Sequence, residues 1–258
     1  MAAPVTVNDK LSWPAYDAVL FDLDGVLTPT AELHKQAWTE LFEQFLDEYV
    51  GLDHEPYTEA DYLAYVDGKP RFDGVRSFLA SRGITLPEGN RDEPPGSGSV
   101  SALGNRKNAV FQELLRSNGI DAYPGSLRLL DHLAVLGIPA AVVSSSRNAR
   151  EVLAAARLAD RFPVIADGIL AAERGIPGKP APDLFLAAAE RLGVAPDEAV
   201  VVEDAVSGVA AGRAGGFGLV VGVDRGAGHD ALVASGADLV VDDLGELVPD
   251  GAGKEAAS

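Results

Sequence analysis

The stretch "AVLFDLDGVLT", residues 18–28, decides the fold, because an apolar run ends there in two aspartates set one residue apart. Residues 19–21 have the pattern of a short buried strand, and Gly25 marks its end. A carboxylate at the tip of such a strand must be paired, metal-bound or protonated, because burying an unpaired charge costs free energy. A second carboxylate nearby raises that free-energy cost. Asp22 and Asp24 therefore predict a positive partner, or a group held neutral, supplied by the rest of the chain.

Length and composition exclude several classes of protein. The 258 residues are enough for one large domain or two smaller ones, and a hydrophobic content of 47% indicates a globular chain. With zero cysteines the chain has no disulfide framework, thiolate nucleophile or zinc knuckle, which fits a reducing interior.

The net charge of -18 argues against binding to nucleic acid or to an anionic membrane, because both need basic patches. An anionic ligand would need a focused cluster of Lys and Arg, or a metal. The N-terminal residues lack the pattern of a signal peptide, and no apolar run approaches the length of about 18 residues that a membrane span needs. We therefore expect a cytoplasmic protein with no membrane partner.

From about residue 122 onward, apolar runs rich in β-branched residues alternate with helical patterns. A helix is predicted over 146–159, after a serine cluster, and another over 181–193, with a proline in its first turn and Gly193 at its end. Such alternation is typical of a doubly wound parallel sheet. The predicted strands are "IPAAVVS" (138–144), "FPVIAD" (162–167), "EAVVVED" (198–204), "FGLVVGV" (217–223) and "ADLVVDD" (237–243).

The region from Thr30 to Asp121 contains helical patterns and no convincing strand, so we interpret it as a helical insertion after the first strand. The tract at 86–100, rich in Pro, Gly and Ser, is predicted to be a surface loop, and "AYPGS" at 122–126 to be the return hinge. The expected domains are a core of residues 1–29 and 122–258 and a helical insertion of residues 30–121. Its predicted helices cover 31–49, 59–66, 73–83 and 106–119.

Polar residues follow several of the predicted strands, and a lysine lies in the loop "GIPGKPAPD". In open α/β sheets, ligands bind outside the carboxyl ends of the strands, where such residues meet. Each residue alone also has an ordinary interpretation as a turn, a helix cap or a surface charge. Their joint placement at strand ends favours a site, composed of Asp22, Asp24, Ser144, Lys179, Glu203 and Asp204.

These residue types suit phosphoryl transfer. Carboxylate oxygens are the ligands that Mg²⁺ takes together with waters and a substrate phosphate, and we assign the metal to Asp22, Asp24, Glu203 and Asp204. A lysine and a serine hydroxyl suit the oxygens of the transferred group. An aspartate can itself attack phosphorus, which gives an aspartyl-phosphate, while a second carboxyl group carries the proton.

Four stretches, "DLDGVLT", "VVSSS", "GKPAPD" and "VVEDAVSG", resemble the motifs of the haloacid dehalogenase superfamily of phosphoryl-transfer enzymes, with the helical insertion in the place of its cap domain. The resemblance implies a Rossmann-like core, Asp22 as nucleophile, Asp24 as acid and base, and Ser144 and Lys179 as phosphoryl-binding residues. The active site is expected between core and cap.

Within that superfamily the chain resembles the β-phosphoglucomutase-like subfamily, through "TAELHKQAW", "DGKPR", "GNRKNAVF" and "SSSRN". Pro29 departs from this pattern, since an acidic residue is usual there, and the cap is longer around 44–62 and 84–103. The resemblance implies that the substrate is bound by Thr30, His34, Arg71, Lys107, Ser146, Arg147 and Asn148.

The implied function is a Mg²⁺-dependent sugar phosphomutase that interconverts β-glucose 1-phosphate and glucose 6-phosphate through a bisphosphate. The alternative is a sugar-phosphate phosphatase with the same core; a second phosphate site formed by Arg71 and Arg147 favours the mutase. Apart from the resemblance, His34 could be a buried core histidine, and Arg71 and Lys107 simple surface charges. A non-enzymatic binding protein is disfavoured because every catalytic position is filled. We expect a monomer with a small sugar phosphate as its partner.

The stretch "GAGHDA", residues 226–231, matches the glycine pattern of a dinucleotide site. It follows a late strand instead of the first, so we interpret it as a loop that enters a helix.

Overall fold

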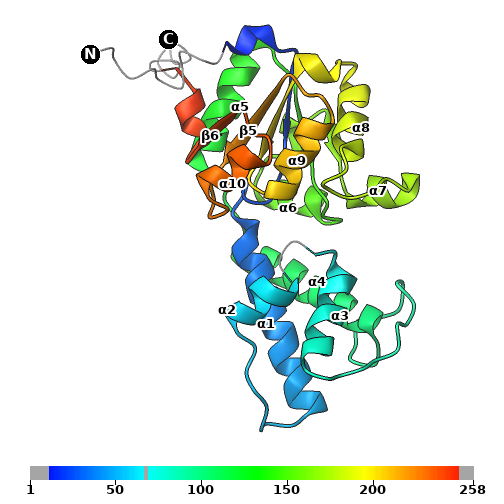
Figure 1. The fold of residues 1–258 in the computed structure, drawn as a ribbon. Coiled ribbons are helices and arrows are strands. Elements are labelled where there is room, and N and C mark those ends of the chain that lie inside the picture. The colour runs from blue at the N-terminus through cyan, green and yellow to red at the C-terminus, as the bar shows by residue number, and fades with distance from the viewer. Residues whose placement is uncertain (1–11, 67–68, 250–258) are drawn as a thin grey trace. The chain divides into compact units, whose positions relative to one another are not determined.

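The computed structural model describes residues 12–66 and 69–249. The chain divides into two compact units, Met1–Pro29 with Ile120–Ser258, and Thr30–Gly119. We call the first unit the core and the second the cap, and Figure 1 shows their elements. The catalytic role that the sequence suggested for the core, and the active site expected between core and cap, stay predictions.

The core is built on a parallel sheet, as the sequence predicted. The order of its strands is β3-β2-β1-β4-β5-β6, so β1 lies in the middle of the sheet. This order, with two halves that start from the same central strand, is that of a doubly wound fold. Among the described residues its strands are β1 (Ala18–Phe21), β2 (Ala140–Val143), β3 (Val164–Ala166), β4 (Ala199–Glu203), β5 (Leu219–Val223) and β6 (Leu239–Val241).

The register of the central strands brings their carboxyl ends level. Phe21 of β1 lies opposite Val142 of β2 and Val202 of β4. The backbone continues this register, because the amide of Asp22 donates to the carbonyl of Val202 at 2.9 Å. Residues that follow these strands in sequence, such as Asp22 and Ser144, therefore emerge at the same edge of the sheet.

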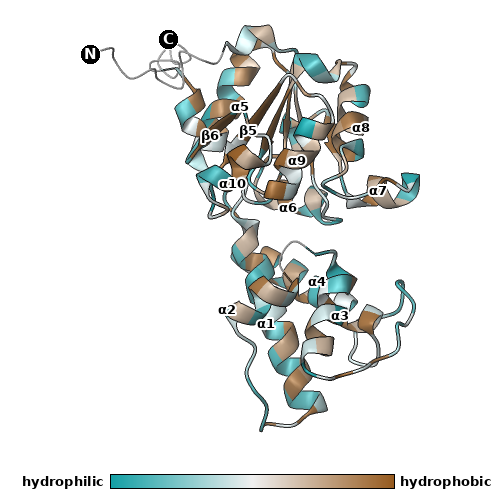
Figure 2. Cartoon of the chain, in the orientation of Figure 1, coloured by the Kyte–Doolittle hydropathy of each residue, from teal (hydrophilic) through white to brown (hydrophobic). Residues whose placement is uncertain are grey.

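Helices cover both sides of the sheet (Figure 1). Leu20 and Val201 on one sheet face are buried in a cluster that includes Phe185 of α8 and Val209 of α9. The strands are the most apolar part of the core, as Figure 2 shows. The helices of the core are α5 (Pro124–Leu136), α6 (Ala149–Ala155), α7 (Gly168–Arg174), α8 (Asp183–Leu192), α9 (Val206–Ala214) and α10 (His229–Ala234), with 3₁₀ turns η2 (Trp13–Ala15), η4 (Ala159–Arg161), η5 (Pro196–Glu198) and η6 (Leu244–Leu247).

Several element boundaries in the core differ from the sequence prediction; the helix predicted over 146–159, for example, is α6 and covers only Ala149–Ala155. The hinge predicted at 122–126 is shorter, because Pro124 begins α5 and proline is favoured at the first helical position. Pro182 lies at the N-cap of α8 instead of inside its first turn, while Gly193 ends that helix with a left-handed φ of 74°, as expected. The stretch 226–231 is a loop that enters α10, also as predicted.

The two ends of the described chain meet in the core. The indole Nε1 of Trp13 donates to the carbonyl of Leu247 at 2.9 Å, and Trp13 is buried. The last 3₁₀ turn, η6, begins with a capping box formed by Asp243 and Glu246. The N-terminal and C-terminal segments are therefore bonded to each other beside the sheet.

The cap is helical, and its described residues form no strand. Its aromatic core includes Phe42 of α1 and Phe78 of α3, whose ring centres lie 4.0 Å apart. No helix in the described parts of core or cap combines the length and apolarity needed to cross a membrane. The cap elements are α1 (Thr30–Tyr49), α2 (Glu59–Asp61), the π-helical turn η3 (Tyr62–Val66), α3 (Arg71–Ser81) and α4 (Val100–Asn118).

The helix α4 begins six residues earlier than the sequence pattern indicated. Ser99 caps its N-terminus, since the Ser99 hydroxyl accepts from the amide of Ala102 at 2.9 Å. The loop before it is tied down by Asn105, whose side-chain amide donates to the carbonyls of Arg91 at 2.9 Å and Glu93 at 2.8 Å. The tract rich in Pro, Gly and Ser is thus a loop, as predicted, with its path fixed by α4.

Candidate active site

A lysine bridges two carboxylates at the carboxyl edge of the sheet. Asp22, 6% exposed, directly follows β1, and its Oδ1 accepts from Nζ of Lys179 at 2.5 Å. The same ammonium donates to Oε1 of Glu203, the last residue of β4, and to the carbonyl of Val143 at 3.4 Å. Three acceptors match the three protons of an ammonium group. Lys179 is therefore the positive partner that the aspartates after β1 required.

The environment shifts the pKa values of this cluster. Burial raises the pKa of Asp22 well above its ordinary value; Lys179 opposes this shift, and Glu203 and Asp24 reinforce it. Burial by itself lowers the pKa of Lys179, but Asp22 and Glu203 outweigh it and the net pKa is raised. Lys179 thus stays charged.

Asp204, which follows Glu203, also lies among more negatively charged groups than positively charged ones. Burial raises the pKa of Asp204 to about 7, and Glu203 and Asp24 add to the rise while Lys179 opposes it. One ammonium therefore faces several carboxyl groups, so the site favours a further cation or a proton.

Two glycines let the carboxylates pack against bare backbone. Gly25 has a φ of 82°, and a Cβ at this position would collide with the carboxylate of Asp204. A Cβ at Gly208 in α9 would collide with the carboxylate of Glu203, whose Oε2 also accepts from the amide of Ala205 at 3.0 Å. The positions of both acidic groups thus depend on glycine at 25 and 208.

The turn after β2 adds hydroxyl groups. Ser144 is buried, and its Oγ lies 3.5 Å from Oδ2 of Asp24 and accepts from the amide of Ser146 at 3.0 Å. The Oγ of Ser146 in turn accepts from the amide of Asn148 at 3.1 Å. Arg147 between them is exposed. Backbone and hydroxyl groups therefore fix this turn, while the Arg147 side chain extends from it.

A second cluster lies within the cap. Nδ1 of His34 is 2.6 Å from Nζ of Lys107, and the His34 ring stacks on Phe111 with ring centres 4.2 Å apart. Burial holds the pKa of His34 well below its ordinary value, and the charges of Lys107 and Arg71 lower it further. The imidazole is therefore neutral and accepts at Nδ1, so its proton is on Nε2, which can donate.

The remaining cap residues differ in their surroundings. Lys107 is 4% exposed and lies over the Trp38 ring at 5.2 Å, so it is not a simple surface charge. Arg71 is the first residue of α3 and is partly exposed, with its guanidinium 5.1 Å from the ring centre of Phe72. Thr30, buried, is the first residue of α1. In "DGKPR", residues 67–68 lie outside the described part of the chain.

The structure thus gathers most of the site residues predicted from the sequence into two groups, one in each unit, while Thr30 and Arg147 are not part of the contacts described above. The core group joins the residues at the ends of β1, β2 and β4 with Lys179, and the cap group joins His34, Lys107 and Arg71. Gly208 and Arg225 were not among the site residues predicted from the sequence. Gly208 lies in the quoted "VVEDAVSG", and Arg225 follows a strand, which is the signal that identified the other residues.

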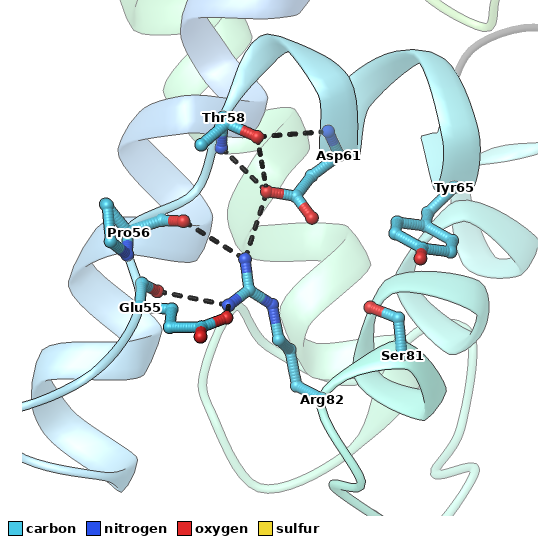
Figure 3. Close-up of a pocket in the computed structure, with 7 residues that line it drawn as sticks. All are labelled: Glu55, Pro56, Thr58, Asp61, Tyr65, Ser81 and Arg82. Carbon is cyan, nitrogen blue, oxygen red and sulfur yellow. Dashed lines mark hydrogen bonds and ion pairs between the residues drawn. The ribbon is translucent and has the colours of Figure 1, made fainter.

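A cavity of about 420 Å³ in the cap involves none of the predicted residues (Figure 3). Arg82 occupies one side of it and donates to the carbonyl of Pro56 at 3.0 Å and to Oδ2 of Asp61 at 3.0 Å. It also donates to the carbonyl of Glu55 at 3.2 Å. Because these bonds use both terminal nitrogens of the guanidinium, we interpret Arg82 as the residue that holds the longer cap segment in place.

Comparisons with known proteins extend over most of the chain. A family model described as haloacid dehalogenase-like hydrolase matches residues 16–216. A β-phosphoglucomutase of Mycobacterium tuberculosis is 52% identical over 240 residues, which cover 90% of this chain and 91% of that protein. Hexitol phosphatase A of Escherichia coli is 33% identical over 201 residues, covering 76% of this chain and 78% of that protein. The crystal structure of a β-phosphoglucomutase from Clostridium difficile matches with a TM-score of 0.68 and 28% identity, covering 90% of this chain and 93% of that one.

Proposed function

Since the chain belongs to the haloacid dehalogenase-like hydrolase family and is an enzyme of its β-phosphoglucomutase-like subfamily, we propose that it is a Mg²⁺-dependent sugar phosphomutase that acts through an aspartyl-phosphate. The observation that carries the proposal is the Lys179 ammonium held between Asp22 and Glu203 at the carboxyl edge of the sheet. A fixed positive charge beside a strand-end carboxylate is what a phosphoryl group, with its charged oxygens, requires during transfer.

In the proposed reaction, a carboxylate oxygen of Asp22 attacks the phosphorus of the sugar phosphate. A bond forms between that oxygen and phosphorus, and the bond from phosphorus to the sugar oxygen breaks. Asp24 gives its proton to the departing oxygen and later removes one from the accepting hydroxyl group of a sugar monophosphate. As that oxygen bonds to phosphorus, the bond from phosphorus to Asp22 breaks, which restores the free carboxylate and forms the sugar bisphosphate. Lys179 and Ser144 bind the phosphoryl oxygens throughout.

The donor set fits Mg²⁺ in the presence of substrate. Within the described residues, no group of three or more acidic or histidine side chains is arranged to hold a metal ion alone. Mg²⁺ takes only one or two carboxylates, and waters and substrate phosphate complete its shell. Bound there, it would neutralise charge on the phosphoryl oxygens. The raised pKa values of Asp22 and Asp204 indicate that a cation is favoured, and we propose that its one or two protein ligands come from Asp22, Asp24, Glu203 and Asp204.

The cap supplies the groups for sugar and second phosphate in this proposal. Arg71 grips the phosphate that is not being transferred, together with Arg147 of the turn after β2, because a guanidinium binds phosphate in a bidentate manner. His34 donates from Nε2 to a sugar oxygen, with its tautomer fixed by Lys107. Thr30, Ser146 and Asn148 complete the substrate site by resemblance to the subfamily.

The proposed substrate pair is β-glucose 1-phosphate and glucose 6-phosphate. It is supported by the 52% identity to a protein named β-phosphoglucomutase, over nine-tenths of both chains. The similarity to hexitol phosphatase A favours a second candidate, a sugar-phosphate phosphatase, in which water attacks the aspartyl-phosphate. We further propose a cytoplasmic monomer that binds neither nucleic acid nor anionic lipid; the net charge of -18 supports the second part, because both of those partners need basic patches.

Arg71→Ala tests the choice between these functions. We expect isomerisation of β-glucose 1-phosphate to fall by about 10²-fold or more, while the slow hydrolysis of acetyl phosphate, which has no second phosphate, is nearly unchanged. Arg76→Ala is the matched control, because Arg76 lies on the same helix and is paired with Glu88 at the surface. Equal losses in both reactions, or a wild-type enzyme that isomerises no hexose phosphate, would favour the phosphatase.

A further inference from the structure

Arg225 connects three segments of the core at the same edge of the sheet as Asp22. It follows β5, and its Nε donates to the carbonyl of Gly25 at 3.0 Å. Its Nη1 donates to the carbonyl of Asp242, after β6, at 2.9 Å. Its guanidinium carbon lies 4.0 Å from the ring centre of Tyr123, the residue before α5. None of the roles proposed above uses this side chain.

Gly25 is the residue through which Arg225 reaches the active site. The amide of Gly25 donates to the carbonyl of Thr28 at 2.8 Å, its carbonyl accepts from Arg225, and its Cα packs against the Asp204 carboxylate. The peptide groups on both sides of the Gly25 Cα are thus held, although glycine is the most conformationally free residue. Asp24 immediately precedes Gly25, so the direction of the Asp24 side chain depends on this anchorage.

The contact with Tyr123 extends the anchorage to the second connection between core and cap. The amide of Tyr123 donates to the carbonyl of Leu27 at 3.0 Å. The chain leaves the core after Pro29 and returns at Ile120. Both connecting segments are therefore bonded to each other within the core, and Arg225 contacts both.

The Arg225 side chain is held at an energetic cost. Its Nη2 is buried and finds no hydrogen-bond partner among residues 12–66 and 69–249. A buried donor without a partner is unfavourable, so stability alone does not account for a guanidinium here. Only arginine can direct Nε to one carbonyl and Nη1 to another while its plane lies over an aromatic ring.

We propose that Arg225 is a positioning residue for Asp24. Through the Gly25 carbonyl it fixes the loop after β1 so that the Asp24 carboxyl group points its proton at the departing sugar oxygen. This inference rests on the proposed function, because it assumes that Asp24 is the general acid.

The test uses leaving groups that differ in their need for a proton. Single-turnover cleavage of 4-nitrophenyl phosphate, phenyl phosphate and β-glucose 1-phosphate is measured with Mg²⁺ for wild type, Arg225→Lys and Arg225→Gln. We expect cleavage of the sugar phosphate to fall by about 10²-fold, because a misplaced general acid loses that much, and cleavage of the nitrophenyl ester to be almost unchanged. Phenyl phosphate should lie between them. On an Asp24→Asn background, Arg225→Lys should add no further selective loss.

Arg213→Lys is the matched control. Arg213 also binds a glycine carbonyl, that of Gly236, through Nε at 3.0 Å and Nη2 at 2.7 Å, but in the loop before β6, at the opposite edge of the sheet. It should leave the dependence on leaving group unchanged. Thermal unfolding identifies which Arg225 variants are folded, and either folded variant decides the question.

Three results separate the possible failures. If wild type cleaves none of the esters, the proposed function fails, and this inference fails with it. If wild type cleaves them and the Arg225 variants lose activity equally on all three, Arg225 is merely structural and only this inference is overturned. The same conclusion follows if Arg213→Lys produces the same selective loss.

Discussion

Lys179→Met should destabilise the metal-free core severely. The ammonium lies between two buried carboxylates, with 10% of its own side chain exposed and 9% and 1% of those of Asp22 and Glu203. Methionine has a similar volume but no charge, so the substitution leaves two buried carboxylates without their partner. Breaking a buried ion pair from one side costs about 3–5 kcal/mol.

Urea unfolding measures this loss. The chain has two tryptophans, and Trp13 lies in the core while Trp38 lies in the cap. On a Trp38→Phe background, the fluorescence of Trp13, which is 3% exposed, therefore reports on the core alone. At pH 8 with a chelator, and with m about 2 kcal/mol per M, the midpoint should fall by about 1.5–2.5 M.

Two further variants make this prediction specific. Lys179→Met with Glu203→Gln should recover about 2 kcal/mol, because one of the two unpaired charges is removed. Arg161→Met, which breaks an ion pair with Asp131 nearer the surface, should cost at most about 1 kcal/mol. At pH 4 the effect of Lys179→Met should shrink, because the pKa of Asp22 is raised well above its ordinary value and this carboxyl group takes up a proton as the pH falls. A Lys179→Met midpoint within the error of the Arg161→Met midpoint at pH 8 would refute the reasoning.

Four other predictions concern conformation and protonation. Gly25→Ala should lower core stability by more than about 1 kcal/mol and remove activity, because alanine is strained at a φ of 82° and its methyl group collides with Asp204; a urea midpoint equal to that of wild type would contradict this. The pKa of Asp204 is raised to about 7, so between pH 4 and 7 the native state keeps a proton that the unfolded chain has lost. The stability of the metal-free core should therefore fall as pH rises from 4 to 7, and saturating Mg²⁺ should reverse this pH dependence. The lowered pKa of His34 gives the opposite pH dependence, because the unfolded chain takes up a proton that the native state does not. The stability of the cap, read from Trp38 fluorescence, should therefore fall as pH drops below about 6.5, and His34→Asn should flatten this dependence. Arg82→Met should lower the stability of the cap by about 2 kcal/mol and leave kcat unchanged, and a lost kcat would mean that the cavity of Figure 3 takes part in the reaction.

The sequence predicted the sheet, and the grouping of polar residues at one of its edges, for a physical reason. Strands buried on both faces are continuous apolar runs, and parallel strands end at one edge. Asp22, Ser144 and Glu203 could therefore be placed together from their positions after such runs, and the register of β1 with β2 and β4 agrees. That Lys179 donates to both Asp22 and Glu203 could not be predicted from the sequence, because it depends on the directions of the side chains.

Other features could not be read from local patterns. His34 and Lys107 are 73 residues apart, and only the packing of α1 against α4 brings Nδ1 to Nζ. The start of α4 was missed because one hydroxyl, that of Ser99, sets it, while the preceding glycines and prolines suggested a longer loop. Arg225 was missed although it follows a strand, because its partners are backbone carbonyls and no second side chain in the sequence indicated its role.

The bond between Trp13 and the carbonyl of Leu247 makes the core suitable for a change of chain connectivity. Since the first and last described elements already lie together, a short linker could join residue 12 to residue 249, and new termini could be opened in the cap loop at 86–99. Such a circular permutant would carry the core as one uninterrupted segment, with the two halves of the cap at its ends. A truncation before η6, in contrast, would remove the acceptor of the Trp13 indole and expose an aromatic surface beside β1, so shortened versions of this enzyme should keep the chain through residue 249.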